Sequence, residues 1–105
     1  MLYSNTSGTT GNVTLSESSA NFDYLEIFFK CRGWEHSQKV ENPNGKTIIS
    51  TTSQFYNGQF YLYNKRMDIS GTTITNAYSI GCLVSDGSTF TDTDNHVVVK
   101  VIGYK

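Results

Sequence analysis

Two histidines and two cysteines are the side chains in this sequence that proteins use most often as bases, nucleophiles or metal ligands. Neither His36 nor His96 belongs to a metal-spaced pattern such as His-Glu-x-x-His. Cys31 and Cys82 each alternate with apolar residues, which is typical of buried, unreactive thiols. We therefore interpret His36 as a loop residue and His96 as a surface residue at the start of a strand, and we expect no metal, no cofactor and no enzymatic activity. A disulfide between the two cysteines, or a Cys-His pair formed only in space, stays open.

Acidic residues gather between positions 86 and 95, where Asp86, Asp92 and Asp94 are interleaved with Ser, Thr and Asn. Carboxylate oxygens are the ligands that calcium prefers, but this spacing does not match an EF-hand loop. Asp and Asn are also ordinary turn formers. We therefore read the segment as a solvated loop, with calcium binding as the lesser alternative.

The aromatic residues are more informative, because seven Tyr, six Phe and one Trp exceed what a core of this size can easily hide. Rings that reach the surface beside Asn, Gln and Asp suit a sugar, since the C–H faces of a pyranose stack on aromatic rings and its hydroxyls need short polar partners. The same rings would suit the interface with another subunit. The residues that we predict to bind such a ligand are Trp34, His36, Tyr56, Asp92 and Asp94.

The element that must organise these residues is a strand over residues 22–31, which shows the strongest alternation in the chain. Leu25, Ile27 and Phe29 fall on one face of this strand, which predicts a core position. Phe22, Tyr24 and Phe28 fall on the other face, and three large rings there predict a cover supplied by a partner, a loop or another subunit. We therefore expect these three residues at an oligomer interface.

Further short alternating segments follow, separated by turn sequences such as Asn42-Pro43-Asn44-Gly45, Asn57-Gly58 and Ser70-Gly71. This spacing predicts an all-β fold, an antiparallel β-sandwich or jelly-roll-like domain of seven to eight strands. Residues 1–105 are expected to form one such domain. The segments 33–38 and 86–95 are predicted to be long loops and are the places where we expect a site.

Composition excludes several classes of function. Only 16% of the residues are charged and the formal net charge is −1, which argues against nucleic acid as a partner. No apolar run approaches the length of a membrane span, so membrane insertion is not expected. The start of the chain has no basic region followed by an apolar stretch, so we do not expect it to direct secretion.

Four segments resemble a domain found in virion proteins of phages that infect Gram-positive bacteria: Leu2–Asn5, Gly8–Ser16, Phe22–Phe28 and Val101–Lys105. The similarity covers both ends of the chain and its strongest strand, and it is less clear between Gly33 and Asn95. The resemblance implies an all-β domain near the C-terminus of a tail-fibre, head-fibre or minor structural protein, located in the virion. It also implies a homotrimer that contacts other virion proteins and adheres to a polysaccharide of the bacterial cell surface.

Three functions therefore follow from the sequence. The leading one is a fibre-head domain that attaches the phage to a cell-surface glycan through exposed rings. The alternative is a structural domain that trimerises, caps a fibre or decorates the capsid without binding a receptor. The third is an enzyme attached to the virion, such as a glycan depolymerase or a peptidase. It would need a nucleophile–base pair in one cleft, or paired carboxylates, which are about 5 to 10 Å apart in glycosidases. Glu26 and Glu35 are the only glutamates near the aromatic segments, and Glu26 is more easily read as packing against Lys30.

Overall fold

The computed structural model describes residues 1–9, 11–31, 34–91 and 96–105. Within these ranges the chain forms nine β-strands and one three-residue 3-10 helix. In chain order they are β1 (Tyr3–Thr9), β2 (Val13–Thr14), η1 (Ser19–Asn21), β3 (Tyr24–Cys31), β4 (Trp34–Glu41), β5 (Thr47–Tyr56), β6 (Gln59–Ser70), β7 (Thr73–Leu83), β8 (Thr89–Thr91) and β9 (His96–Tyr104). None of the described helical segments has the length and apolar character needed to cross a bilayer.

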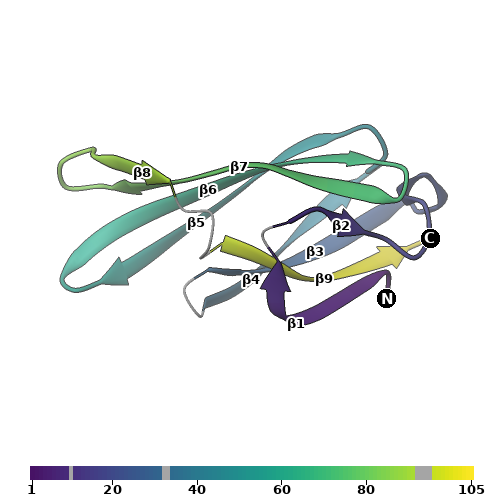
Figure 1. Ribbon diagram of the computed structural model, residues 1–105, viewed down its shortest axis with the longest axis horizontal. Helices are drawn as coiled ribbons and strands as arrows, with labels where there is room; N and C mark the ends of the chain where they lie inside the picture. Colours follow the sequence, from purple (N-terminus) through teal and green to yellow (C-terminus); the bar gives the residue numbers. More distant parts are fainter. Residues whose placement is uncertain (10, 32–33, 92–95) are drawn as a thin grey trace.

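The strands form two antiparallel sheets that pack face to face, as the predicted sandwich requires. One sheet has the order β1-β9-β3-β4, and the other has the order β2-β7-β6-β5 with β8 paired to β7. Figure 1 shows that the β5–β6 and β7–β8 hairpins extend on the left beyond the four-stranded sheet, at the end opposite both chain termini. We call this overhanging end the open end of the sandwich.

Two of the predicted turns, Asn57-Gly58 and Ser70-Gly71, lie between neighbouring strands of the five-stranded sheet, and the third, residues 42–45, connects β4 of one sheet to β5 of the other. Asn57 and Gly58 connect β5 to β6 with φ values of 52° and 77°. A two-residue hairpin turn of this kind needs positive φ at both positions, which Asn and Gly accept more readily than other residues. The turn fixes the register of the hairpin, so that Tyr56 pairs with Gln59 and Gln54 pairs with Tyr61.

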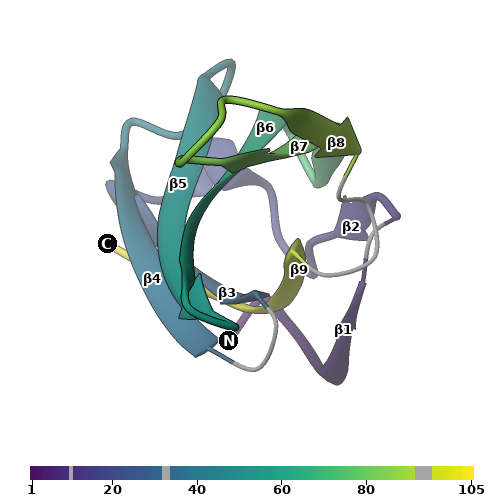
Figure 2. The same ribbon diagram turned by 90° about the vertical axis from the view of Figure 1, so that its left-hand side faces the viewer.

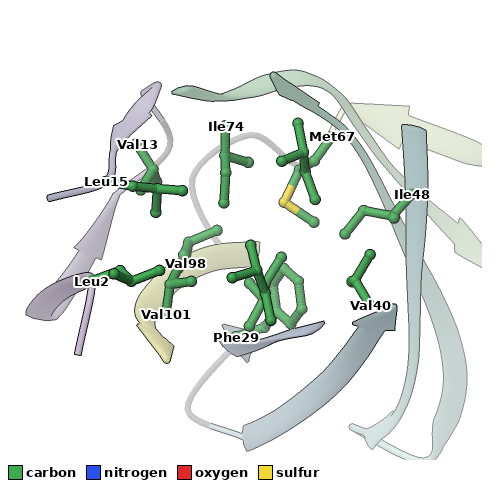
Figure 3. Close-up of a cluster of buried hydrophobic side chains, with 13 residues drawn as sticks. Leu2, Val13, Leu15, Phe29, Val40, Ile48, Met67, Ile74, Val98 and Val101 are labelled. Atoms are coloured by element: carbon green, nitrogen blue, oxygen red, sulfur yellow. The ribbon is translucent and has the colours of Figure 1, made fainter. Parts of the chain in front are cut away.

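The core lies between the sheets, in the half of the molecule nearer the termini (Figure 3). Leu25, Ile27 and Phe29 of β3 are fully buried, which confirms the predicted core face of this strand. The other members of the core cluster come from both sheets and from the segment around β2: Leu2, Val13, Leu15, Val40, Ile48, Met67, Ile69, Ile74, Val98 and Val101. Figure 3 shows the labelled side chains of the two sheets pointing toward one another.

Two segments that we predicted to be loops contain strands. Residues 33–38 were expected to form a loop, but β4 begins at Trp34 and pairs with β3 along its whole length. Burial alternates along β4 as in any half-buried strand, but two of its inward positions carry the polar residues His36 and Gln38. The strand therefore lacks the apolar alternation by which a strand is recognised in a sequence. In the segment 86–95, residues 89–91 form β8 on the edge of β7, and residues 92–95 lie outside the described residues.

The strand that we expected to begin at Phe22 begins at Tyr24. Phe22 lies before β3 and packs against the core cluster of its own chain. Its ring lies over Gly103 of β9, and a Cβ atom placed on Gly103 would come within 2.5 Å of Phe22 Cδ1. The absence of a side chain at Gly103 therefore makes room for the Phe22 ring. Phe22 thus packs against its own chain, whereas we predicted it on the outer face of the sheet.

Gly103→Ala is expected to lower the free energy of unfolding by about 1 to 3 kcal/mol, because the new methyl group must displace the Phe22 ring. The same substitution in a Phe22→Ala background should cost no more than about 0.5 kcal/mol, since the ring is then gone. Urea unfolding of the four proteins of this cycle measures both values. Equal costs in the two backgrounds would contradict the contact.

Candidate functional site

Aromatic rings are exposed on the inward-facing sides of the two sheets, at the end of the four-stranded sheet and on the hairpin that overhangs it. Trp34 begins β4 and is 65% exposed, and Tyr56 ends β5 and is 61% exposed. Side chains two residues apart on a strand point to the same face. Trp34 therefore shares a face of β4 with Val40, and Tyr56 shares a face of β5 with Ile48. Val40 and Ile48 are buried in the core, so these faces are the inward-facing ones. They are exposed because the inward-facing rows continue past the core toward the open end, which Figure 2 views end-on.

Carboxamide groups accompany these rings on the inner face of the β5–β6 hairpin. Tyr56 lies opposite Gln59, and Gln54 lies opposite Tyr61, so rings and amides alternate across the two strands. The Tyr61 hydroxyl donates to Gln59 Oε1 over 3.3 Å. Gln54 Oε1 is buried and has no hydrogen-bond partner among the described residues. We call Trp34, Gln54, Tyr56, Gln59 and Tyr61 the open-end site.

The sequence predicted Trp34 and Tyr56 but not Gln54, Gln59 or Tyr61 as site residues. The signal for the second group was present in the Asn57-Gly58 turn, because that turn fixes which residues of the hairpin lie opposite each other. Once Tyr56 is placed on a face, the register places Gln54 and Tyr61 on the same face.

His36, which we predicted to bind a ligand from a loop, points instead from β4 toward the space between the sheets. Its ring stacks on Phe29 with the ring centroids 5.1 Å apart, and burial lowers the pKa of the imidazole. The neutral ring therefore packs at the boundary between the apolar core and the open end, and its contacts are those of a structural residue.

His96 differs from our prediction, because this residue is fully buried at the start of β9 rather than exposed there. Its ring lies 5.3 Å from the His36 ring and 5.6 Å from the Phe29 ring, between centroids. Neither ring nitrogen has a hydrogen-bond partner among the described residues. Burial, with the nearby His36 and Lys65, lowers the pKa of His96 to about 4, so the ring is neutral at pH 7.

Asp92 and Asp94 lie outside the described residues, so the structure places neither of these predicted ligand-binding residues. Asp86, upstream, serves a turn: its Oδ1 accepts bonds from the Ser88 backbone N–H over 2.9 Å and from the Ser88 hydroxyl over 2.7 Å. The backbone bond is the main reason that the pKa of Asp86 lies below its usual value. In the part of the chain that the structure covers, no three His, Cys, Asp or Glu residues are grouped so as to hold a metal ion.

The outer face of the four-stranded sheet carries Tyr24 and Phe28, two of the three residues that we predicted at an oligomer interface. Tyr24 stacks on Tyr104 with the centroids 4.6 Å apart, and the Lys39 ammonium lies 4.3 Å from the Tyr24 centroid. The Lys100 ammonium lies 4.2 Å from the centroid of Phe28. The chain thus covers part of both rings itself, by cation–π contacts and by the apolar stems of the lysines.

Glu26 and Glu35, the two glutamates considered for catalysis, lie on β3 and β4 and have separate surroundings. Glu26 accepts bonds from the Ser37 hydroxyl over 3.1 Å and from the Tyr104 hydroxyl over 3.5 Å. Glu35 borders a surface hollow of about 280 Å³, lined also by Ser4, Thr6, Phe28, Phe29, Val99 and Lys100. Because Lys100 covers the Phe28 ring, that hollow does not offer a free aromatic face for stacking.

Comparison with known proteins returned no match to a family model, to a curated protein or to a solved structure. The disposition of the described side chains is therefore the main basis on which a function can be argued.

Proposed function

We propose that this protein is an attachment domain of a phage virion that binds a glycan of the bacterial cell surface through the open-end site. The observation that carries this proposal is the exposure of Trp34 and Tyr56 on the inward-facing rows of the two sheets, at the ends of β4 and β5 that point away from the chain termini. Each ring can stack on the C–H face of a sugar unit. The sequence resemblance to phage virion domains supplies the biological setting.

The polar groups around the rings fit the same ligand. Sugar hydroxyls need acceptors and donors within a short distance of the stacked face, and Gln54 and Gln59 provide both on the hairpin that carries Tyr56 and Tyr61. The Gln59 carboxamide is exposed beside the Tyr61 hydroxyl, so these two groups can exchange hydrogen bonds with the hydroxyls of a stacked sugar.

Trp34→Ala and Tyr56→Ala are each expected to weaken glycan binding at least about tenfold, because each removes a ring that anchors the ligand. Binding would be measured against an array of cell-wall and capsular polysaccharides of Gram-positive bacteria, and then by calorimetry on the best ligand. Phe60→Ala is the matched control, since Phe60 is 60% exposed on the opposite face of the same hairpin. A Trp34→Ala protein that binds as well as the parent would remove the open-end site from the proposal.

A structural role without receptor binding is the second candidate. It is favoured by a group of apolar side chains that the chain leaves exposed on the outer face of the five-stranded sheet, including Phe55 and Phe60. A homotrimer built through Tyr24 and Phe28 stays a prediction. The lysines that lie over these two rings already cover much of the aromatic surface that a second copy was expected to cover.

A further inference from the structure

The edge of the five-stranded sheet is formed by β5, a strand of ten residues that pairs only with β6 in the part of the chain that the structure covers. Its other side therefore offers a row of backbone N–H and C=O groups to a partner strand. Proteins usually protect such edges with charged side chains, proline, bulges or shortness. The residues of β5, TIISTTSQFY, include no charge, proline or glycine, and its pairing with β6 has no register shift.

The other sheet edges in the described residues are protected. On β4, Glu35, Lys39 and Glu41 point outward along the strand. The pairing of β1 with β9 contains a register shift, and β2 and β8 are only two and three residues long. The open edge of β5 is thus distinguished from the rest by both its length and its lack of charge.

Apolar side chains lie exposed on the outer face of the same sheet. On β5 itself, Ile49 is 57% and Phe55 60% exposed. Phe55 pairs with Phe60 of β6, with the ring centroids 4.8 Å apart, and Leu62 and Val84 extend this exposed group toward β7. We call Phe55, Phe60, Leu62 and Val84 the outer apolar patch; Ile49 is exposed on the same face, six residues along β5 from Phe55. Contiguous exposed apolar groups of this kind mark interaction surfaces.

We propose that two copies of this chain pair through antiparallel β5 edges about a twofold axis at Thr52. This register is self-complementary, because it sets Ile49 of each copy opposite Phe55 of the other and Thr51 opposite Ser53. It continues the sheet from one copy into the next and sets Ile49 of each copy beside the outer apolar patch of the other, on one face of the sheet. β5 carries no charged residue, so no like charges meet along the seam. The proposal does not depend on glycan binding.

The test is the mass of the intact protein in solution, by sedimentation equilibrium and native mass spectrometry. The parent is expected to be a dimer, in place of the homotrimer that the sequence resemblance implies. Ile49→Lys combined with Phe55→Lys sets like charges opposite each other twice and should raise the dimer dissociation constant at least about a hundredfold. Ile49→Lys combined with Phe55→Glu sets opposite charges in the same places and should restore most of the affinity.

Val84→Lys is the matched control, because it changes the outer apolar patch at a turn two strands away from the edge. It should leave the dimer nearly unchanged. All of these positions are exposed, so circular dichroism and urea unfolding should show a folded chain in every variant. A monomeric or trimeric parent, a dimer insensitive to the paired lysines, or a dimer lost equally in Val84→Lys would each overturn the proposal.

Discussion

Phe29→Ala is expected to lower the free energy of unfolding by about 3 to 5 kcal/mol, the usual cost of removing a fully buried aromatic ring. Phe29 joins two environments within the sandwich. Its ring belongs to the core cluster and also contacts both histidines, stacking on His36 and meeting His96 edge-on. Removing it opens a cavity between the sheets and leaves both imidazoles without their apolar neighbour. Urea unfolding followed by far-UV circular dichroism at pH 7.5 measures the loss.

The matched control is Phe28→Ala, one residue earlier on the same strand. Phe28 points to the outer face, where it is half-buried beneath Lys100. Its removal loses the burial of a half-exposed ring and one cation–π contact, so we expect the free energy of unfolding to fall by about 1 to 2 kcal/mol. Similar costs for the two substitutions would contradict the assignment of the inner and outer faces of β3.

These two faces are also the part of the fold that the sequence predicted best. In β3 every inward position is apolar, so the two-residue period is visible without any knowledge of the neighbouring strands. The turns were equally clear, because Asn57-Gly58 and Ser70-Gly71 need unusual backbone angles that few residues adopt. Both signals are local, which is why they could be read from the sequence alone.

The long strands β5, β6 and β7 were harder to predict, because their middle positions carry polar residues on the inner face. Lys65 of β6 is buried and lies between Ser50 of β5 and Ser79 of β7, so the apolar alternation is interrupted where the three strands run side by side. A sequence pattern treats such an interruption as the end of a strand. Burial of these groups depends on the opposite sheet, which no local window contains.

The candidate site could be predicted only in part for a related reason. Trp34 and Tyr56 were singled out as rings beside polar residues, and both are exposed. Their exposure follows from the overhang of the β5–β6 hairpin beyond the other sheet, which depends on the relative lengths of strands distant in the sequence. His36 was assigned to the same surface, but the alternation of β4 turns it inward onto Phe29.

Lowering the pH from 6.5 to 4 is expected to destabilise the protein by roughly 3 kcal/mol through His96 alone. The pKa of this imidazole is about 4 in the folded protein, against 6.5 for the group in a model peptide. Between these values the unfolded chain binds a proton that the folded chain does not, so the free energy of unfolding falls as the pH falls. The contribution is fully present above pH 6.5 and is lost as the pH approaches 4.

The described groups that act on His96 oppose its protonation. Burial is the largest cause, and His36 of β4 and Lys65 of β6 also disfavour a positive charge on the imidazole. Phe29 meets the ring edge-on and offers it no acceptor. Protonation of His96 is therefore unfavourable in the folded protein.

His96→Leu isolates this effect from the titration of carboxylates elsewhere in the chain. The variant keeps a buried apolar side chain of similar size and removes two ring nitrogens that have no partner, so it should be at least as stable as the parent at pH 7.5. Urea unfolding of both proteins at half-unit steps from pH 7.5 to pH 4 gives the difference between them at each pH. That difference should grow in favour of His96→Leu as the pH falls, because only the parent gains a proton on unfolding at this position. Parallel curves would show that His96 titrates normally in the folded state and would contradict the lowered pKa.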